Sequence, residues 1–331
     1  MNKTMIFKNA PKILATDTIC GPKEAAGNLS DFIDKKLSDD YYGEKSFELA
    51  ERKMLTNVVG NVIKKSGKTA EEISAIIAGD LLNQIISASF SAREFNTGFI
   101  GVYNACSTMT ESMMLAAALV DGGYLQNAVC ATASHFATAE RQYRFPLEQG
   151  TTRPAQSQWT VTGAGANLIG KAEKGISIIS ATVGQVIDYG VTDTNNMGAA
   201  MAPAVAHTLL DFFETRKKKP RDYDLILTGD LGSLGSRLLK ELLIKKKVPL
   251  DNHLDCGELI YNMDETEYQG GSGAGCSAVV FNSYIYKRML LGDFKKVLFI
   301  ATGALLSTTS TQQGESIPGI AHLIELKNDY V

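Results

Sequence analysis

The sequence is short of cysteine, histidine and long apolar runs, and these shortages exclude several classes of protein. Its five cysteines form no C-x-x-C pair, which argues against a disulfide framework or a zinc knuckle and indicates a reducing compartment. The apolar run Met113–Val120 ends at Asp121, far short of a membrane span. Lys3, Lys8 and Lys12 stand near the start without the apolar core of a signal peptide. We therefore expect neither a signal peptide nor a transmembrane segment, and any membrane association to be peripheral.

The charge of the chain is nearly balanced. There are 33 Lys and Arg against 36 Asp and Glu, a formal net charge of −3. No overall field attracts nucleic acid, so we expect no nucleic-acid partner. A chain of 331 residues, 44% of them hydrophobic, is long enough for two domains or two fused halves around a large core.

The chain contains an alternation of strand and helix patterns. Apolar residues recur at helical intervals over Phe47–Lys65, and short apolar runs bounded by turn residues lie before and after it. The predicted strands of the first half are Lys12–Thr18, Ile73–Ala78, Phe99–Val102, Ala128–Ala133 and Thr162–Ile169, with further helices at Asn83–Phe90 and after Cys106. The alternation indicates an α/β protein with a mostly parallel sheet and helices on both faces.

The second half of the chain repeats the first. The predicted strand at Ile73–Ala78 ends in Gly79-Asp80-Leu81, and a predicted strand at Leu225–Thr228 ends in Gly229-Asp230-Leu231, an offset of 150 residues (229 minus 79). The glycine-rich stretch Gly270–Gly275 leads into the helical run Cys276–Leu291, as the turn around Cys106 leads into a helix in the first half. We predict two similar halves, residues 1–174 and 175–331, related by a pseudo-twofold axis.

Cys106 stands at the start of a helix pattern that is apolar on almost every face. We predict a strand at Phe99–Val102, a tight turn of small residues, and a buried helix with Cys106 in its first turn. The positive end of the helix dipole and its free N–H groups favour thiolate, so Cys106 is a candidate nucleophile or part of an anion site. The alternative is a small apolar residue at a crowded turn.

Seven short stretches spread over most of the chain carry a family resemblance. They are Gly79-Asp80-Leu81-Leu82-Asn83-Gln84, Ala105-Cys106-Ser107-Thr108, Ser134-His135 with Ala139–Arg144, Gln158–Gly163, Asn196–Pro203, Thr228–Gly232 and Gly270–Gly273. In these stretches the chain resembles the stage V sporulation protein AD family of spore-forming bacteria, within the wider thiolase and ketoacyl-synthase superfamily.

This resemblance implies a fold, a ligand and a location. The implied fold is a thiolase-like pair of duplicated βαβαβαββ halves in α-β-α-β-α layers, assembled as a homodimer. The implied function is binding of dipicolinic acid, free or as its calcium chelate, and support of its uptake into and release from spores. The implied partners are membrane proteins of the same uptake system, at the cytoplasmic side of the forespore or spore inner membrane. We expect no cofactor and no metal site.

The residues that condensing enzymes of this superfamily use are largely replaced. Thiolases have a histidine before the glycine-rich turn, where this chain has Glu267 and Tyr268. Their second cysteine follows the penultimate strand, where Ile300–Gly303 contains none, and the synthase histidine is replaced by Asp230. The resemblance therefore implies a protein without catalysis. The alternatives are an active acyl-CoA condensing or acyltransferase enzyme with Cys106 as its nucleophile, and a pure scaffold for a membrane complex.

The histidines offer few replacements for the missing base. His207 lies in a predicted helix and His322 in a predicted strand, and we expect both to be structural. His253, in a predicted loop, and His135 remain candidates.

We expect the ligand to lie at the Cys106 turn. Hydroxyl and backbone donors come from the turn, carboxylate-matching cations from three arginines, and close backbone approach from the glycine-rich stretch. The predicted ligand-binding residues are Cys106, Ser107, Thr108, His135, Arg141, Arg144, Arg153, Gly271 and Ser272. For each arginine the alternative is a surface or interface ion pair.

Two further charged features each have two interpretations. Asp80 and Asp230 close equivalent strands, and capping of the following helices is the favoured role over a place in the site. Lysine-rich runs lie at Arg216–Lys219 with Arg221 and at Lys245–Lys247, after predicted helices. Solvated cations at helix ends are the default interpretation, and contact with anionic lipid or an integral membrane partner is the alternative.

Overall fold

The computed structural model describes residues 3–144, 152–262 and 268–330. Its strands are β1 (Thr4–Ile6), β2 (Lys12–Cys20), β3 (Lys35–Lys36), β4 (Ala75–Gly79), β5 (Gly98–Gly101), β6 (Asn127–Ser134), β7 (Trp159–Thr160), β8 (Gly163–Gly170), β9 (Ile176–Thr182), β10 (Leu225–Thr228), β11 (His253–Asp255), β12 (Gly271–Ser272), β13 (Lys296–Ala304) and β14 (Gly319–Asn328). Its α-helices are α1 (Pro22–Ala25), α2 (Phe47–Lys65), α3 (Ile86–Ala92), α4 (Thr108–Asp121), α5 (Phe136–Tyr143), α6 (Met197–Arg216), α7 (Gly232–Lys245), α8 (Cys256–Ile260), α9 (Ala274–Val280), α10 (Tyr286–Leu290) and α11 (Thr308–Gln312).

The main sheet has the same strand order in its two parts. It runs β11-β10-β13-β14-β9-β2-β8-β6-β4-β5, with β1 on β9 and β3 on β2. From either edge inward, two parallel pairings are followed by two antiparallel ones. The two Gly-Asp-Leu stretches follow β4 and β10, which hold equivalent places in this order. The repeat noticed along the sequence is therefore a repeat of topology.

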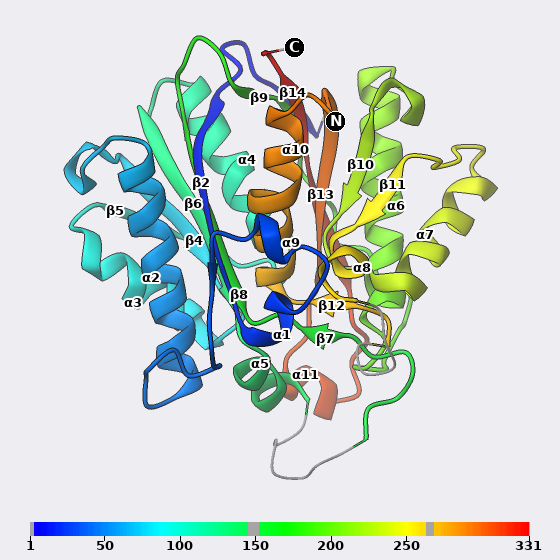
Figure 1. The fold of residues 1–331 in the computed structure, drawn as a ribbon. Coiled ribbons are helices and arrows are strands. Elements are labelled where there is room, and N and C mark those ends of the chain that lie inside the picture. Colours follow the sequence, from blue (N-terminus) through cyan, green and yellow to red (C-terminus); the bar gives the residue numbers. More distant parts are fainter. Residues whose placement is uncertain (1–2, 145–151, 263–267, 331) are drawn as a thin grey trace.

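The elements form alternating layers of helices and strands. Figure 1 shows α2 and α3 outside one part of the sheet, α6 and α7 outside the other, and α4, α9 and α10 between them. Helix α4 contacts β6 on one side and β13 and β14 on the other, which explains why it is apolar almost all round. The predicted α/β class and thiolase-like layering are confirmed. The expectation of a mostly parallel sheet is wrong, because the central strands β8, β2, β9 and β14 pair antiparallel with their neighbours in the sheet order.

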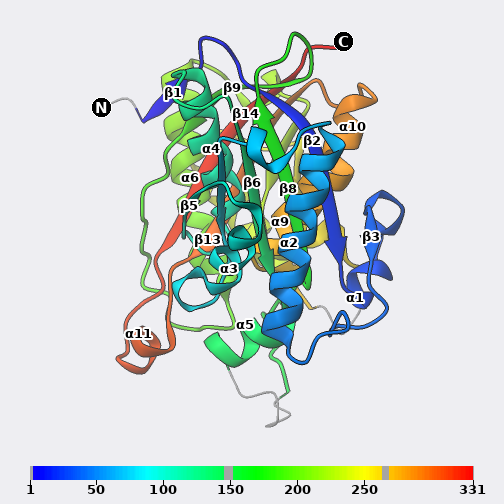
Figure 2. The same ribbon diagram turned by 90° about the vertical axis from the view of Figure 1, so that its left-hand side faces the viewer.

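Helix α2 shows how local sequence sets an outer layer. The hydroxyl of Ser46 accepts a hydrogen bond from the Leu49 N–H at 3.3 Å and caps the helix, whose bounds are those predicted. Met54, Leu55 and Val58 lie on its buried face. Figure 2 shows this helix running along the sheet. Burial of one face, with lysines in the last turn, is typical of a helix that covers a sheet.

The carboxyl ends of the parallel strands gather at one end of the molecule. Strand β6 ends beside α5 and β13 ends near α11, both at the lower end in Figure 1. Strand β4 is parallel to β6, and β10 is parallel to β13, so their Gly-Asp-Leu ends lie at the same side. Crevices at such strand ends are the usual place for ligand sites in α/β sheets.

Candidate functional site

A pocket lies at these strand ends, and both halves of the chain contribute to it. It contains about 480 Å³ of space, part of it open to solvent. The parallel pair β7–β12 brings Thr160 of the first half beside Ser272 of the second. The lining residues are Leu81, Tyr103, Ala105, Cys106, Ala139, Tyr143, Arg144, Thr160, Met197, Met201, Ser272, Gly273, Ala304 and Leu306.

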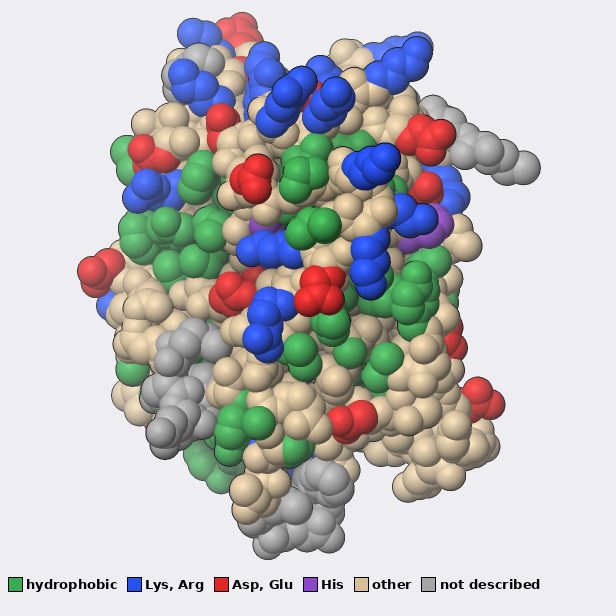
Figure 3. Space-filling model, turned by 90° about the vertical axis from the view of Figure 1, so that its right-hand side faces the viewer, with side chains coloured by type: hydrophobic (Ala, Val, Ile, Leu, Met, Phe, Trp, Pro, Cys, Tyr) green, Lys and Arg blue, Asp and Glu red, His purple; other side chains and the backbone are tan. Residues whose placement is uncertain are grey.

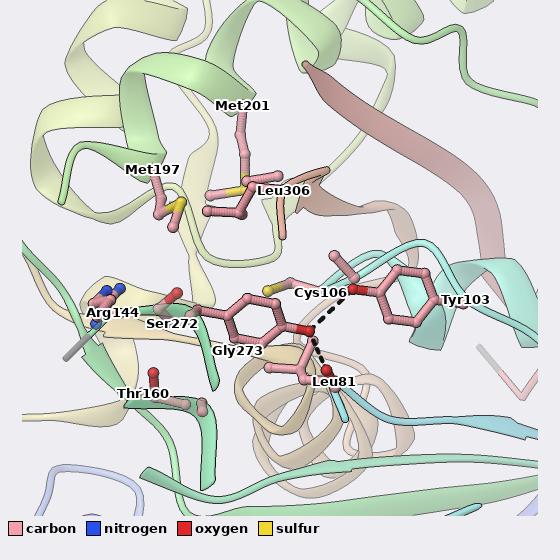
Figure 4. Close-up of a pocket in the computed structure, with 14 residues that line it drawn as sticks. Leu81, Tyr103, Cys106, Arg144, Thr160, Met197, Met201, Ser272, Gly273 and Leu306 are labelled. Atoms are coloured by element: carbon pink, nitrogen blue, oxygen red, sulfur yellow. Dashed lines mark hydrogen bonds between the residues drawn. The ribbon is translucent and has the colours of Figure 1, made fainter. Parts of the chain in front are cut away.

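The pocket has an apolar side and a polar side. Figure 4 shows Met197, Met201 and Leu306 on one side of the space, and Thr160 and Ser272 on the other. The guanidinium of Arg144 lies at one end of the polar side. Cys106 lies at the centre of the view, with its sulfur directed into the space. Such a pocket suits a small ligand with an apolar face and an anionic edge.

A strained turn presents Cys106. Ala105 has a φ of 49°, in the left-handed region that side chains other than glycine rarely adopt, and α4 begins only at Thr108. Cys106 therefore precedes the helix, and the prediction that it lies in the first helical turn is wrong by two residues. The turn is closed by hydrogen bonds from the Ser107 N–H to the Asn104 carbonyl at 3.0 Å and from the Thr108 N–H to the Ala105 carbonyl at 3.3 Å.

Asp230 is the nearest charged partner of Cys106. Its carboxylate accepts hydrogen bonds from the Gly273 N–H at 2.9 Å, the Ser272 hydroxyl at 3.3 Å and the Thr302 hydroxyl, and its charge raises the pKa of the Cys106 thiol. Burial raises the pKa of Asp230 to about 6, although these hydrogen bonds act in the opposite direction. The carboxylate is thus mostly ionised at neutral pH.

This arrangement stabilises the thiol form of Cys106. Burial raises the pKa of Cys106 well above its ordinary value, and the charge and hydrogen bond of Asp230 raise it further. The Gly273 N–H and Arg144 lower this pKa by less. The expectation that the helix dipole favours thiolate is therefore wrong, because desolvation and an adjacent carboxylate outweigh a half-charge at a helix end.

The two strand-end aspartates have different roles. Asp80 accepts from the Leu82 N–H at 2.8 Å and from the Ala88 N–H at 2.7 Å, so it caps the start of α3 as predicted. Asp230 does not cap α7, because Asp255 accepts from the N–H groups at the start of that helix, those of Leu231 and Gly232. The favoured interpretation is thus wrong for Asp230, which faces Cys106 instead.

Arg144 is the predicted arginine that the structure places in the pocket wall. Its side chain is only 5% exposed, its Nη1 donates to Glu140, and its Nε is buried without a hydrogen-bond partner. Glu140 also accepts from Arg153 at 2.6 Å. One carboxylate thus serves two guanidinium groups, so this trio has one excess positive charge beside the pocket.

The other predicted cations and His135 lie outside the pocket lining. Arg141 pairs with Glu48 on the surface, and their side chains are 41% and 44% exposed. Arg153 donates to Glu140 and to the Gln158 carbonyl. The His135 ring accepts from the Ala137 N–H through Nδ1, which caps α5, and donates to the Asp40 carbonyl through Nε2, so both nitrogens are used inside the protein. Burial lowers the pKa of His135.

The turn residues Ser107 and Thr108 use their hydroxyls inside the protein. The Ser107 hydroxyl donates to the Ala301 carbonyl at 2.9 Å, and the Thr108 hydroxyl donates to the Ala105 carbonyl at 2.7 Å. Neither lines the pocket. Gly271 in β12 does not line the pocket either, whereas the next residue, Ser272, does. The structure thus brings Cys106, Arg144 and Ser272 together, and ligand contact by any of the predicted residues stays a prediction.

The remaining histidines do not line the pocket, although His322 contacts the turn beside Cys106: its ring meets the Asn104 amide at 3.2 Å, and its N–H donates to the Ser107 hydroxyl at 3.2 Å. His207 lies in α6 and His322 in β14, as predicted. His253 is the first residue of β11, so its placement in a loop is wrong, and burial lowers its pKa to about 4. None of the three lines the pocket. Glu267, expected before the glycine-rich turn, lies outside the described residues.

Several lining residues were not predicted. Tyr103 and Tyr143 meet in the pocket, where their hydroxyl oxygens are 3.1 Å apart. Met197 and Met201 come from the start of α6, inside the stretch that carried the family resemblance. Their spacing of four places both on one helix face, which was the available signal. Within the described ranges, no three His, Cys, Asp or Glu side chains gather into a group that would hold a metal ion.

Comparison with solved structures defines the class of fold. An OleA variant from Xanthomonas campestris superposes over 98% of both chains, with a TM-score of 0.63 and 13% identity. The 3-oxoacyl-[acyl-carrier-protein] synthase III of Aquifex aeolicus VF5 matches 96% of this chain and 99% of its own, with a TM-score of 0.60 and 12% identity. The molecule is therefore a thiolase-like α/β protein. At these identities the likeness is one of fold alone.

Comparison of sequences defines the family. The family model described as stage V sporulation protein AD (SpoVAD) matches residues 1–327. Stage V sporulation protein AD of Bacillus subtilis (strain 168) is 44% identical over 321 residues, which are 97% of this chain and 95% of that protein. The chain belongs to the stage V sporulation protein AD family.

Proposed function

We propose that the pocket binds dipicolinic acid, free or as its calcium chelate, and that the protein supports the uptake of this ligand into spores and its release without catalysing a reaction. Dipicolinate is a flat pyridine ring with two carboxylates. The observation that carries the proposal is the buried, unpartnered Nε of Arg144 in the wall of a pocket that is otherwise largely apolar.

The charge around Arg144 supports recognition of a carboxylate. A buried donor without a partner is unfavourable by about 1–3 kcal/mol, and a ligand oxygen removes that cost. Because Glu140 is shared between Arg144 and Arg153, the guanidinium is not fully neutralised before the ligand arrives. A charge-assisted hydrogen bond from Arg144 is therefore the expected anchor for one ligand carboxylate.

The opposite walls support a flat ring. Met197 and Met201 offer thioether groups, which pack well against aromatic rings, and Leu306 extends this apolar side. Thr160 and Ser272 provide hydroxyls on the other side. A flat ring between these walls would cover apolar surface while its carboxylates meet the polar end.

The surroundings of Cys106 support a role without catalysis. A condensing or acyl-transfer nucleophile needs a neighbour that accepts its proton. Here the neighbour is the Asp230 carboxylate, which raises the pKa of the thiol instead. If the alternative of an acyl-transfer enzyme held, incubation with acetyl-CoA would leave an acetyl adduct on Cys106 that passes to a second acyl group. We expect mass spectrometry to find no such adduct.

Calorimetry with single variants tests the ligand and its place. Arg144→Ala should weaken dipicolinate binding about ten- to a hundredfold, because a charge-assisted contact contributes about 1.5–3 kcal/mol. Arg141→Ala is the matched control, since that arginine pairs with Glu48 on the surface, and should leave the affinity unchanged. Cys106→Ser should retain most of the affinity, and Cys106→Trp should block the pocket. Unchanged binding in both Arg144→Ala and Cys106→Trp would place the ligand elsewhere.

We further propose a homodimer that pairs through β5. This strand stands at one end of the sheet order, and all four of its residues are exposed. Phe99 and Ile100 are 36% and 38% exposed, and Phe90 nearby on α3 is 40% exposed. An open edge with apolar side chains is an unfavourable surface for a monomer, and a second copy would cover it.

We also propose a peripheral location at the spore inner membrane, beside membrane proteins of the same uptake system. The two lysine-rich runs meet around one groove, where Lys218, Lys219, Arg221 and Lys247 outnumber Glu214 and Asp251. Figure 3 shows Lys and Arg side chains over the upper half of the face that carries α6 and α7. Such a surface suits an anionic leaflet. In the described part of the chain, no helix combines the length and apolarity needed to cross a membrane.

A further inference from the structure

Two tyrosines and a leucine separate the Cys106 pocket from a second hollow. This hollow contains about 790 Å³ of space, part of it open to solvent, and lies against the end of β5 and the segment Leu82–Ile85. Tyr103, Tyr143 and Leu306 line both spaces. Residues common to two adjacent spaces form the wall between them.

The two tyrosine rings are fixed by hydrogen bonds. The Tyr143 hydroxyl donates to the Leu81 carbonyl, so the contact of 3.1 Å between the two hydroxyls uses the proton of Tyr103. Both contacts meet at the Tyr143 oxygen. The same Leu81 carbonyl accepts from the Gln142 side chain at 2.6 Å. The wall is thus tied to the end of β4 at one defined point.

The backbone beyond the wall has a strained conformation. Gln84 and Ile85 have φ values of 56° and 48°, and two successive left-handed residues, one of them β-branched, each cost about 1–3 kcal/mol. Asp80 holds this segment at both sides through the Leu82 and Ala88 N–H groups. The segment that lines the second hollow therefore has a defined conformation, held by hydrogen bonds to Asp80.

We propose that Tyr103 and Tyr143 set the maximum length of the ligand in the Cys106 pocket. This proposal rests on the proposed function, because it concerns the same pocket. The hydrogen-bonded pair closes the pocket on the side of the second hollow, and that hollow is the space that a longer chain would need. The wall would therefore favour a short ligand, such as a single-ring dicarboxylate, over a ligand with a long acyl chain.

Alkylation of Cys106 tests the wall without using dipicolinate. The full-length protein is treated at about pH 9, where more thiolate is present, with iodoacetamide and separately with N-decyl iodoacetamide. Peptide mass spectrometry gives the rate at Cys106 for each reagent, and Cys106→Ser identifies reaction at other cysteines. A change in the pKa of the thiol alters both rates by the same factor, so it does not affect their ratio. The ratio therefore reports the space available to the decyl chain of the long reagent.

We expect the long reagent to react far more slowly than the short one in the unaltered protein. Tyr103→Ala and Tyr143→Ala should each raise the long-to-short ratio about tenfold or more, since blocked approach to a reacting atom costs on the order of a hundredfold. The phenylalanine variants keep the rings and should give intermediate ratios. Tyr124→Ala is the matched control, because that tyrosine is 80% exposed and lines neither space.

Three results would overturn the proposal. They are an unaltered protein that accepts both reagents equally, alanine variants with an unchanged ratio, and no reaction at Cys106 in any variant, which would mean that another barrier closes the pocket. If Tyr143→Ala does not fold, Tyr103→Ala decides, since its ring is already 42% exposed. If the alanine variants raise the long-to-short ratio but the protein does not bind dipicolinate, the proposed ligand is rejected and the wall is kept. If the protein binds dipicolinate but the ratio does not change, only the wall is rejected.

Discussion

Replacing Asp230 by asparagine should make the Cys106 thiol more reactive toward alkylating reagents. Asparagine has nearly the same shape, so the variant removes the negative charge beside the sulfur while leaving an oxygen for the Gly273 N–H. The charge and hydrogen bond of Asp230 raise the pKa of Cys106, after burial itself. Asp230→Asn should therefore increase the fraction of thiolate and the rate of alkylation.

The expected gain can be worked from the contact between Asp230 and Cys106. If the separation is taken as about 4 Å and the effective dielectric constant as about 20, a unit charge shifts the balance between thiol and thiolate by about 4 kcal/mol. That is nearly a thousandfold in thiolate fraction, at about 1.4 kcal/mol for each factor of ten. Because thiolates become weaker nucleophiles as their pKa falls, roughly half of this logarithmic gain reaches the rate, about thirtyfold.

The assay is iodoacetamide labelling of Cys106 followed by peptide mass spectrometry. Asp80→Asn is the matched control, because Asp80 also ends a strand and is fully buried but caps α3. Thermal unfolding verifies that both variants are folded. An unchanged or slower rate in folded Asp230→Asn would show that the carboxylate does not set the state of the thiol, and the argument against catalysis would lose its main support.

Three further predictions concern stability and surfaces. Burial raises the pKa values of Glu24 and Asp255 from ordinary values near 4 to about 7, so the stability contributed by their protonated forms is complete below about pH 4 and is lost as pH rises to about 7; the melting temperature should fall between about pH 4 and pH 7, and a rise over that range would contradict this. Ile100→Lys should convert the proposed dimer to a monomer, as measured by light scattering. A monomeric unaltered protein would refute the proposed dimer. Lys218→Glu with Lys247→Glu should abolish salt-sensitive co-sedimentation with phosphatidylserine vesicles, and equal sedimentation would reject the basic groove as the membrane contact.

Local patterns were sufficient for most elements of the fold. The helix predicted at Phe47–Lys65 and the strand at Leu225–Thr228 have the predicted bounds, because each carries its own periodicity or apolar run between turn residues. The helix predicted at Asn83–Phe90 is less regular. It starts with a short 3₁₀ turn at Asn83–Ile85, and α3 follows only at Ile86. There the capping contacts of Asp80 decide where the helix begins.

The sequence by itself determined the alternation of strands and helices, the repeat and the turn that carries Cys106. These are properties of neighbouring residues or of residue types. Only the tertiary structure decided that Arg144 enters the pocket while Arg141 stays at the surface, and that Asp230 faces the thiol. The polar wall depends on pairing Thr160 with Ser272, more than a hundred residues apart. Contacts of this kind depend on which segments the packing of the layers brings together, and no local pattern encodes that choice.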